Sequence, residues 1–375
     1  MLHRAPPGAS GPRILFVPNW PIAPASDASG RQSPDYYPLD GLYWFFRHFR
    51  TPVAVDVLDS DIWWPSRLEE RAFHMYLSQG LVAAHFGREY DIVFAFGAQS
   101  AVALLAAWRV RRRHHPPVVV DDAGCLNAGR PDRRFSFAAT RWAMGEANRI
   151  IWHAHASLDL CRVACPELAA KGDYVPFGVN LEDLAAARPR DGDYAVCAGN
   201  SPRDWEALAE GWRAFPDRQL ILLGPRPKGG APLPKNVRAM GRVPFRDYVD
   251  LLAGARVVLL PLPDGWASWG QMTLLQAMAL GKPVVVTDVR PVRDYIAEGC
   301  VTVPPNDVRG LMDAASALWL DGTLRSGVGR AAKQVVTERF DERIMAQRFE
   351  AVVLRALDSG TVQPGEGCHN GSSES

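Results

Sequence analysis

The sequence lacks the cysteine spacings that would indicate a metal centre or a redox pair. Its 6 cysteines include no CxxC pair, and no Cys/His cluster has the spacing of zinc ligands. His153 and His155 alternate without a third ligand nearby. We therefore predict free thiols in a reducing compartment and no metal site.

Long apolar runs are missing as well. No stretch reaches the ~18–20 apolar residues that a membrane-spanning helix needs, and the stretch Met1–Arg13 lacks the apolar core of a signal peptide. A formal net charge of +1 gives no overall attraction to nucleic acid. These absences predict a cytoplasmic protein, free or peripheral at the inner membrane face, with no nucleic-acid partner.

The chain of 375 residues, 47% hydrophobic and 22% charged, is long enough for two cores. Short apolar runs alternate with helical patterns, which is typical of parallel sheets with helices on both faces. The expected elements of the first half are the strands Ile14–Val17, Val53–Leu58, Ile92–Phe96, Val118–Val120, Ile150–Trp152 and Tyr174–Phe177 and the helices Gln99–Arg113 and Phe135–Asn148.

A second series of the same kind follows Leu181–Asp193, a polar segment that we interpret as a linker. The predicted domains are thus 1–180 and 181–341, with a helix near 342–357 that packs back on the first domain and a disordered tail at 359–375. The expected elements of the second half are the strands Tyr194–Ala198, Gln219–Leu223, Val237–Ala239, Val257–Leu260, Pro283–Thr287 and Val301–Val303 and the helices Arg203–Ala214, Phe245–Leu252, Thr273–Leu280 and Val308–Leu320.

The segment Pro261–Thr287 is the strongest candidate for binding chemistry. A loop with Gly265 and Gly270 leads into a helix, whose first N–H groups and dipole favour an anion. A glycine before a helix lets phosphate approach the backbone closely. From the residues alone, a phosphate loop and a simple turn remain equal alternatives.

This segment resembles the signature region of the retaining, GT-B fold glycosyltransferases of family 4, the glycosyl transferases group 1. The family's Leu-Leu-Glu-Ala-Met-Ala-x-Gly-Lys-Pro-Val-Val pattern matches Leu274–Val285 except for Gln276, and Tyr174–Glu182 is similar to its interdomain segment. The resemblance implies two Rossmann-like, doubly wound α/β domains facing a central cleft. The first would take an acceptor and the second a nucleotide-sugar donor.

The sequence departs from the family's pattern at two positions. Gln276 stands where the family places a glutamate that binds ribose, and Ser268 stands where a second glutamate is usual. Asp264 is the nearest upstream acid, with a solvated turn residue as the alternative reading. Arg203 is the predicted diphosphate clamp because its guanidinium matches phosphate oxygens; the alternative is a pairing with Asp204. The predicted donor-binding residues are Gly199, Asn200, Arg203, Ser268, Gly270, Gln271, Met272, Thr273 and Gln276.

The sequence gives weaker signals for the residues that would bind the acceptor. Asp121 and Asp122 follow a predicted strand, and the loop with Gly30 follows another, so both lie at strand ends, where ligands of parallel sheets bind. We predict Asp122, with Arg203, as catalytic, and Asp121 and Gly30 as acceptor contacts; the alternative for the acids is an Asx turn. The basic run Arg109–Arg113 predicts either a solvated face or a peripheral membrane contact.

The predicted reaction moves a sugar from a nucleotide-diphosphate donor to a hydroxyl of a glycan, a lipid-linked or a small-molecule acceptor. By the resemblance, the anomeric configuration is retained, and no metal or other cofactor is needed. A nucleotide-sugar epimerase on the same scaffold and a non-catalytic partner protein are the alternatives. An NAD enzyme is disfavoured because no GxGxxG follows the first predicted strand.

Overall fold

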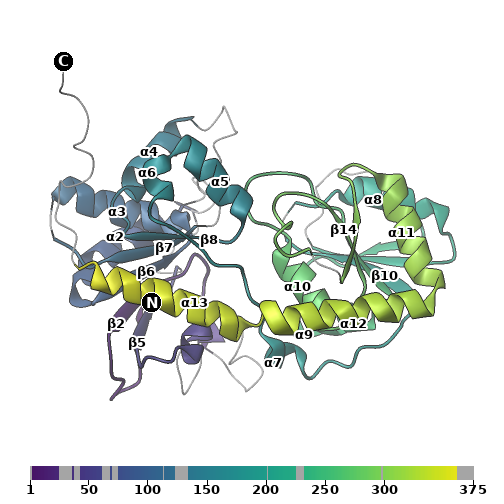
Figure 1. The fold of residues 1–375 in the computed structure, drawn as a ribbon, viewed down its shortest axis with the longest axis horizontal. Helices are drawn as coiled ribbons and strands as arrows, with labels where there is room; N and C mark the ends of the chain where they lie inside the picture. Colours follow the sequence, from purple (N-terminus) through teal and green to yellow (C-terminus); the bar gives the residue numbers. More distant parts are fainter. Residues whose placement is uncertain are drawn as a thin grey trace. The chain divides into compact units, whose positions relative to one another are not determined.

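The chain forms two compact units, each built around its own sheet (Figure 1). The computed structural model describes residues 2–24, 36–37, 43–60, 68–69, 75–112, 114–122, 134–200, 202–224, 232–296 and 299–360. Unit 1 consists of Met1–Val175 with Met345–Ser375, and unit 2 of Pro176–Ile344. None of the helices in these ranges is both long and apolar enough to cross a membrane.

The sheet of unit 1 has the strand order β1-β5-β2-β6-β7-β8-β9. All neighbours pair in parallel except the edge strand β1, which runs antiparallel to β5. The central strands are buried runs because elements cover both faces. The elements of its main body are β1 Leu2–His3, β2 Arg13–Val17, η2 Trp44–His48, β5 Ala54–Leu58, α2 Leu77–Phe86, η3 Gly87–Glu89, β6 Ile92–Phe96, α3 Ala98–Arg111, β7 Val118–Asp122, α4 Arg134–Met144, β8 Arg149–Trp152, α5 His155–Ala164, α6 Pro166–Ala169 and β9 Gly172–Tyr174, beside a small ladder of β3 Ala23–Pro24 and β4 Tyr36–Tyr37.

Helix α13, Glu342–Asp358, returns to unit 1 at the end of the chain (yellow in Figure 1). Its Phe349 is fully buried, with its ring centroid 4.6 Å from that of Phe45 and 5.6 Å from that of Phe94. The carboxylate of Glu350 accepts hydrogen bonds from the backbone N–H groups of Arg50, at 3.0 Å, and Thr51, at 2.7 Å. The last helix is therefore part of the aromatic core of unit 1.

Unit 2 contains a fully parallel sheet of order β12-β11-β10-β13-β14-β15. Helices α9, α10 and α12 contribute to the core on one face, and α8 and α11 to the core on the other. Its elements are α7 Leu181–Leu184, β10 Tyr194–Ala198, α8 Trp205–Gly211, η5 Trp212–Ala214, β11 Gln219–Leu223, β12 Val237–Ala239, α9 Phe245–Gly254, β13 Val257–Leu260, α10 Gln271–Ala279, β14 Val284–Thr287, β15 Cys300–Val303, α11 Val308–Leu320 and α12 Gly322–Arg339.

The segment predicted as a linker, Leu181–Asp193, is instead packed on unit 2. Asn180 caps helix α7 through its side-chain oxygen, and Leu184 is buried in the core that contains α10. Lys282 donates a hydrogen bond of 2.8 Å to the carbonyl of Arg190. One buried leucine and side-chain bonds to the backbone hold the segment, which is why no hydrophobic periodicity marked it.

The strand expected at Tyr174–Phe177 is shorter than predicted and earlier in the chain, because β9 ends at Tyr174. The N–H of Val175 still donates to the carbonyl of Trp152, but Pro176 has no N–H to continue the ladder. The tail predicted to be disordered lies outside the described residues from 361 onward.

Candidate functional site

Most of the predicted donor residues lie at the carboxyl ends of β10 and β13, two neighbouring parallel strands of unit 2. Gly199 to Arg203 connect β10 to α8, and the loop after β13 leads into α10. Ligands of open parallel sheets bind at this edge. The side chain of Asn200 is exposed there, whereas Arg203 is only 8% exposed.

Gly199 makes room for the guanidinium of Arg203. Its φ is +131°, and a Cβ atom built on it would lie 2.3 Å from Nη2 of Arg203 and 3.2 Å from Oγ1 of Thr273. Arg203 Nε and Nη1 donate to the carbonyls of Ala198, at 3.2 Å, and Pro202, at 3.0 Å. Burial lowers the pKa of Arg203, but a guanidinium stays charged in proteins. The loop therefore holds a buried cation with its Nη2 above Gly199.

The alternative for Arg203, a pairing with Asp204, is not what the structure shows. Asp204 accepts a hydrogen bond of 3.1 Å from the N–H of Ala207 and so caps helix α8. The Arg203 side chain bonds backbone carbonyls instead.

Helix α10 begins without a side-chain cap. Its N-cap residue is Gly270, with φ of +87°, so the first N–H groups of the helix have no capping acceptor from a side chain. Ser268 Oγ and Gln271 Oε1 are buried atoms without a hydrogen-bond partner in the described residues, and Met272 is half-buried. Unpaired N–H groups and unpaired buried oxygens at one helix end are features of a place where a polar ligand binds.

Gln276 lies on α10 one turn after Thr273 and is 9% exposed. Its Oε1 accepts a hydrogen bond of 2.7 Å from the hydroxyl of Tyr248 on α9. Burial raises the pKa of Tyr248 to about 12, while a hydrogen bond with Thr273 and the charge of Arg203 lower it. The sequence did not single out Tyr248, because a contact between two helices leaves no local pattern.

Asp264, the acid nearest to the missing glutamate, is occupied in holding the loop. Its carboxylate accepts hydrogen bonds from the backbone N–H and the guanidinium of Arg290, the shortest being 2.6 Å from Nη2. These bonds lower the pKa of Asp264, and the guanidinium also lies 3.7 Å from the ring centroid of Trp266. Asp264 is thus an anchor between two loops rather than a carboxylate free to act on a substrate.

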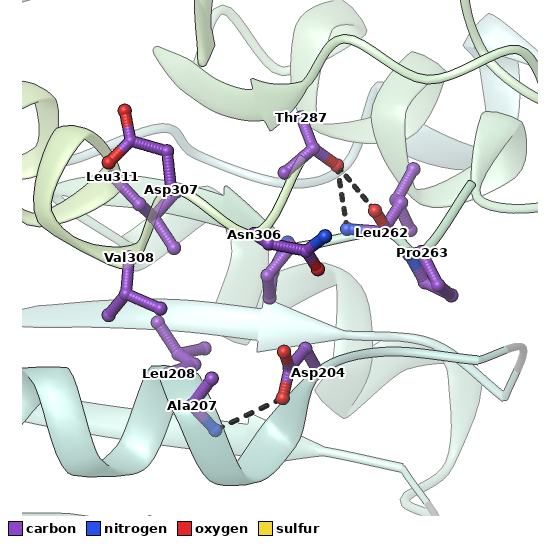
Figure 2. A pocket seen from close by; sticks show the side chains of 11 residues that line it. Asp204, Ala207, Leu208, Leu262, Pro263, Thr287, Asn306, Asp307, Val308 and Leu311 are labelled. Atoms are coloured by element: carbon purple, nitrogen blue, oxygen red, sulfur yellow. Dashed lines mark hydrogen bonds between the residues drawn. The ribbon is translucent and has the colours of Figure 1, made fainter. Parts of the chain in front are cut away.

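A small pocket of about 50 Å³ lies nearby, on the side of α8 and α11 (Figure 2). The side chains of Asp204, Asp307 and Thr287, which line it, are engaged within the protein. Asp204 and Asp307 cap the two helices, and Thr287 Oγ1 lies 2.8 Å from both the N–H and the carbonyl of Leu262. The pocket therefore reflects helix capping, and none of the predicted donor residues lines it.

In unit 1, the side chain of Asp121, near the end of strand β7, lies in the interior. It is fully buried, and its Oδ1 lies 2.7 Å from Nε2 of His153, whose Nδ1 lies 2.7 Å from the carbonyl of Val175. The Asp121 carboxylate thus supports the end of β8 and is not on the surface. The side chain of Asp122, and Gly30 altogether, lie outside what the structure describes.

The described residues contain no group of three or more His, Cys, Asp or Glu side chains placed to hold a metal ion. Whether the reaction needs a metal remains a prediction from the sequence.

Replacing Gly199 by alanine is expected to weaken nucleotide binding by about 10–100-fold, the cost of one charge-assisted hydrogen bond, because the new Cβ displaces the Arg203 guanidinium. Isothermal titration with a nucleoside diphosphate measures this effect. Gly241→Ala is the matched control, since Gly241 also has a positive φ, of +66°, but its Cβ would meet nothing within 4 Å. Equal affinity losses in the two variants would assign the effect to backbone strain instead.

Comparisons with known proteins agree with this geometry. Residues 199–321 match the sequence profile of the family described as glycosyl transferases group 1. The matched region begins at Gly199 and includes α10, so the site described above falls inside it.

Two curated relatives match about half of the chain. The phosphatidyl-myo-inositol mannosyltransferase of Mycobacterium leprae is 30% identical over 207 residues, which are 50% of this chain and 54% of the relative. A second relative of that name, from Mycolicibacterium smegmatis, is 28% identical over 207 residues, 50% of this chain and 52% of the relative. The chain thus spans about half the length of the curated relatives it matches.

Solved structures extend the likeness to the whole fold. Sucrose-phosphate synthase from Thermosynechococcus elongatus has a TM-score of 0.67 at 14% identity, covering 93% of this chain and 100% of its own. HepE of Anabaena in complex with UDP and glucose has a TM-score of 0.66 at 15% identity, covering 92% and 100%. The fold is GT-B, as the resemblance implied.

Proposed function

We propose that the protein is a glycosyltransferase that moves a sugar from a nucleotide-diphosphate donor to an acceptor hydroxyl. The observation that supports this most directly is the Arg203 guanidinium above Gly199, beside the uncapped start of α10. A buried cation and free N–H groups would stabilise the negative charge of a leaving diphosphate. The mannosyltransferase relatives and the UDP bound to HepE support a nucleotide-sugar donor.

In the proposed reaction, the bond between the sugar anomeric carbon and the diphosphate oxygen breaks, and its electron pair leaves with the diphosphate. A bond to the acceptor oxygen forms on the same face of the sugar, so the configuration is retained, and the hydroxyl proton is released. Arg203 and the first N–H groups of α10 would bind the departing diphosphate, so no metal is required. Met272, Ser268 and Asn200 would line the donor.

On the acceptor side, we propose that Asp122 orients the hydroxyl, with Gly30 near it, and that Asp121 acts indirectly through His153. The acceptor would be a glycan, a lipid-linked molecule or a small molecule, reached in the cytoplasm or at the inner membrane face. Neither the epimerase nor the non-catalytic alternative is favoured by the family or by the solved relatives.

A thermal-shift screen with UDP-, GDP-, ADP- and dTDP-sugars tests the proposal on the full chain. A sugar nucleotide at about 100 times its Kd adds about 2.7 kcal/mol to the stability, and so raises Tm by several degrees. Product formation with the stabilising donor then identifies the acceptor. If none of these nucleotides moved Tm, the proposed function would be wrong.

A further inference from the structure

Side chains hold the loop between β13 and α10 in place. Residues 261–270 lie in neither a helix nor a strand. Near the start of the loop, the N–H of Leu262 donates to Oγ1 of Thr287 at 2.8 Å. In its middle, Asp264 accepts hydrogen bonds from the backbone N–H, Nε and Nη2 of Arg290. The shape of the loop therefore depends on residues at the end of β14, the neighbouring strand, and just after it.

Arg290 lies on a firmly packed segment. Val289 and Val292, on either side of it, are 1% and 0% exposed and belong to the core that contains α10. The N–H of Asp288 donates to the carbonyl of Val303 at 2.8 Å. Buried side chains and this bond fix the segment, so Arg290 holds the loop rather than being held by it.

The Arg290 side chain contacts the loop at two points. Its Nη2 lies 2.6 Å from Oδ2 of Asp264, and its Cζ lies 3.7 Å from the ring centroid of Trp266. The guanidinium thus gives its N–H groups to a carboxylate while it lies over an indole, a pair of contacts that a lysine does not reproduce. One residue therefore fixes two positions of the loop.

The end of the loop carries polar groups of a different kind from Arg203. Ser268 Oγ and Gln271 Oε1 are buried and have no hydrogen-bond partner in the part of the chain that the structure describes. A hydroxyl and a carboxamide can each donate and accept, as sugar hydroxyls do, whereas phosphate oxygens accept. Arg203, which only donates, suits the diphosphate. The loop and Arg203 therefore suit different parts of a nucleotide-sugar donor.

We propose that Arg290 is a positioning residue for the sugar half of the donor. Through Asp264 and Trp266 it fixes the loop that carries Ser268, and it takes no part in binding the diphosphate. The inference rests on the proposed function, because it needs a nucleotide sugar at this edge of unit 2. It also makes Asp264 the partner of Arg290 and not a substitute for the glutamate that the family places nearby.

Arg290→Ala in the full chain is expected to lower kcat/KM for the donor by about 10–100-fold, mainly through kcat, because a small misplacement of the substrate costs that much. The Kd of the nucleoside diphosphate should not change, since Arg203 and the start of α10 are intact. UDP-glucose with UDP and GDP-mannose with GDP are the first probes. Initial rates of UDP or GDP release give kcat and KM, and isothermal titration gives the Kd. Unchanged kcat/KM, or an equal loss of diphosphate affinity, would overturn the inference.

Arg293→Ala is the matched control. Arg293 follows β14 in the same segment, is 60% exposed, and pairs with Asp288 at 2.9 Å instead of with the loop. Its kcat/KM is expected to equal that of the unmodified chain. Equal losses in Arg293→Ala and Arg290→Ala would assign the effect to the segment as a whole and would contradict the inference. Exposed ion pairs contribute little to stability, so both variants should fold, which melting curves check.

A double-mutant cycle separates holding the loop from chemistry at Asp264. Asp264→Asn alone should cost less kcat/KM than Arg290→Ala, because Arg290 keeps its contact with Trp266. Added to Arg290→Ala, it should change little, because the contact that it weakens is already lost. A further large loss in the double variant would give Asp264 a catalytic role of its own and overturn the inference. Arg290→Lys keeps the charge without the fork and should recover only part of the rate.

The proposed function and this inference fail in different ways. If the unmodified chain turned over none of the sugar nucleotides of the thermal-shift screen, both would be wrong. If the unmodified chain turned over a donor and Arg290→Ala did so with the same kcat/KM, only the inference would be wrong.

Discussion

Replacing Arg203 by alanine is expected to lower kcat/KM for the donor by about 10²–10³-fold, as the loss of a donor to developing negative charge does in other enzymes. The side chain is held by the carbonyls of Ala198 and Pro202, so its Nη2 is already oriented before a ligand binds. An oriented cation in a buried setting stabilises a leaving diphosphate more than a mobile surface charge does. Initial rates with the donor from the thermal-shift screen measure the effect.

Two further variants sharpen this experiment. Arg203→Lys keeps the charge but loses the planar fork, so we expect it to recover only part of the activity. Arg213→Ala removes an exposed arginine of the same unit, paired with Glu210 at 2.6 Å, and should leave the rate unchanged. An Arg203→Ala enzyme with at least half of the normal kcat/KM would contradict the assigned role. Melting curves of the three variants exclude unfolding as the cause.

Phe349→Ala is expected to lower the free energy of unfolding by about 3–5 kcal/mol, the usual cost of removing a large aromatic side chain from a core. The ring is fully buried between Phe45 and Phe94, so the cavity would open where α13 joins the sheet of unit 1. Urea unfolding followed by tryptophan fluorescence measures the change.

Leu354→Ala, on the same helix, is the control for Phe349→Ala. The Leu354 side chain is 37% exposed, and its truncation is expected to change the stability by about 0.5 kcal/mol or less. Similar losses in the two variants would show that the loss in Phe349→Ala does not come from its buried aromatic contact.

The helices and strands that were predicted correctly are determined by residues close to one another in the sequence. The strand Val257–Leu260 is a buried apolar run that ends before Pro261. Helix Val308–Leu320 begins after Asp307, whose carboxylate caps it at the N–H of Gly310. Elements defined by distant partners were not predicted. The edge strand Leu2–His3 exists only because it pairs with Leu58 and Val57, far along the chain.

The candidate site likewise combines residues that local sequence signals predict with residues that only distant partners determine. Gly199, Arg203 and the start of α10 are visible in the sequence because glycines and helix-start signals are local. The bond from Tyr248 to Gln276 joins residues 28 positions apart, and that from Arg290 to Asp264 joins residues 26 positions apart. Such pairs decide which amides and carboxylates are engaged within the protein, and only the folded chain brings them together.

The return of α13 to unit 1 also sets an order in which the protein can be made. Arg50 bonds Glu350 across 300 positions, so a chain growing on the ribosome carries an unfinished first unit until its last helix emerges. Unit 2, which is continuous, can fold before that moment. A chain released early would expose the apolar surface around Phe45 and Phe94, which invites aggregation and capture by chaperones. Burial of that surface thus requires that α13 has been translated.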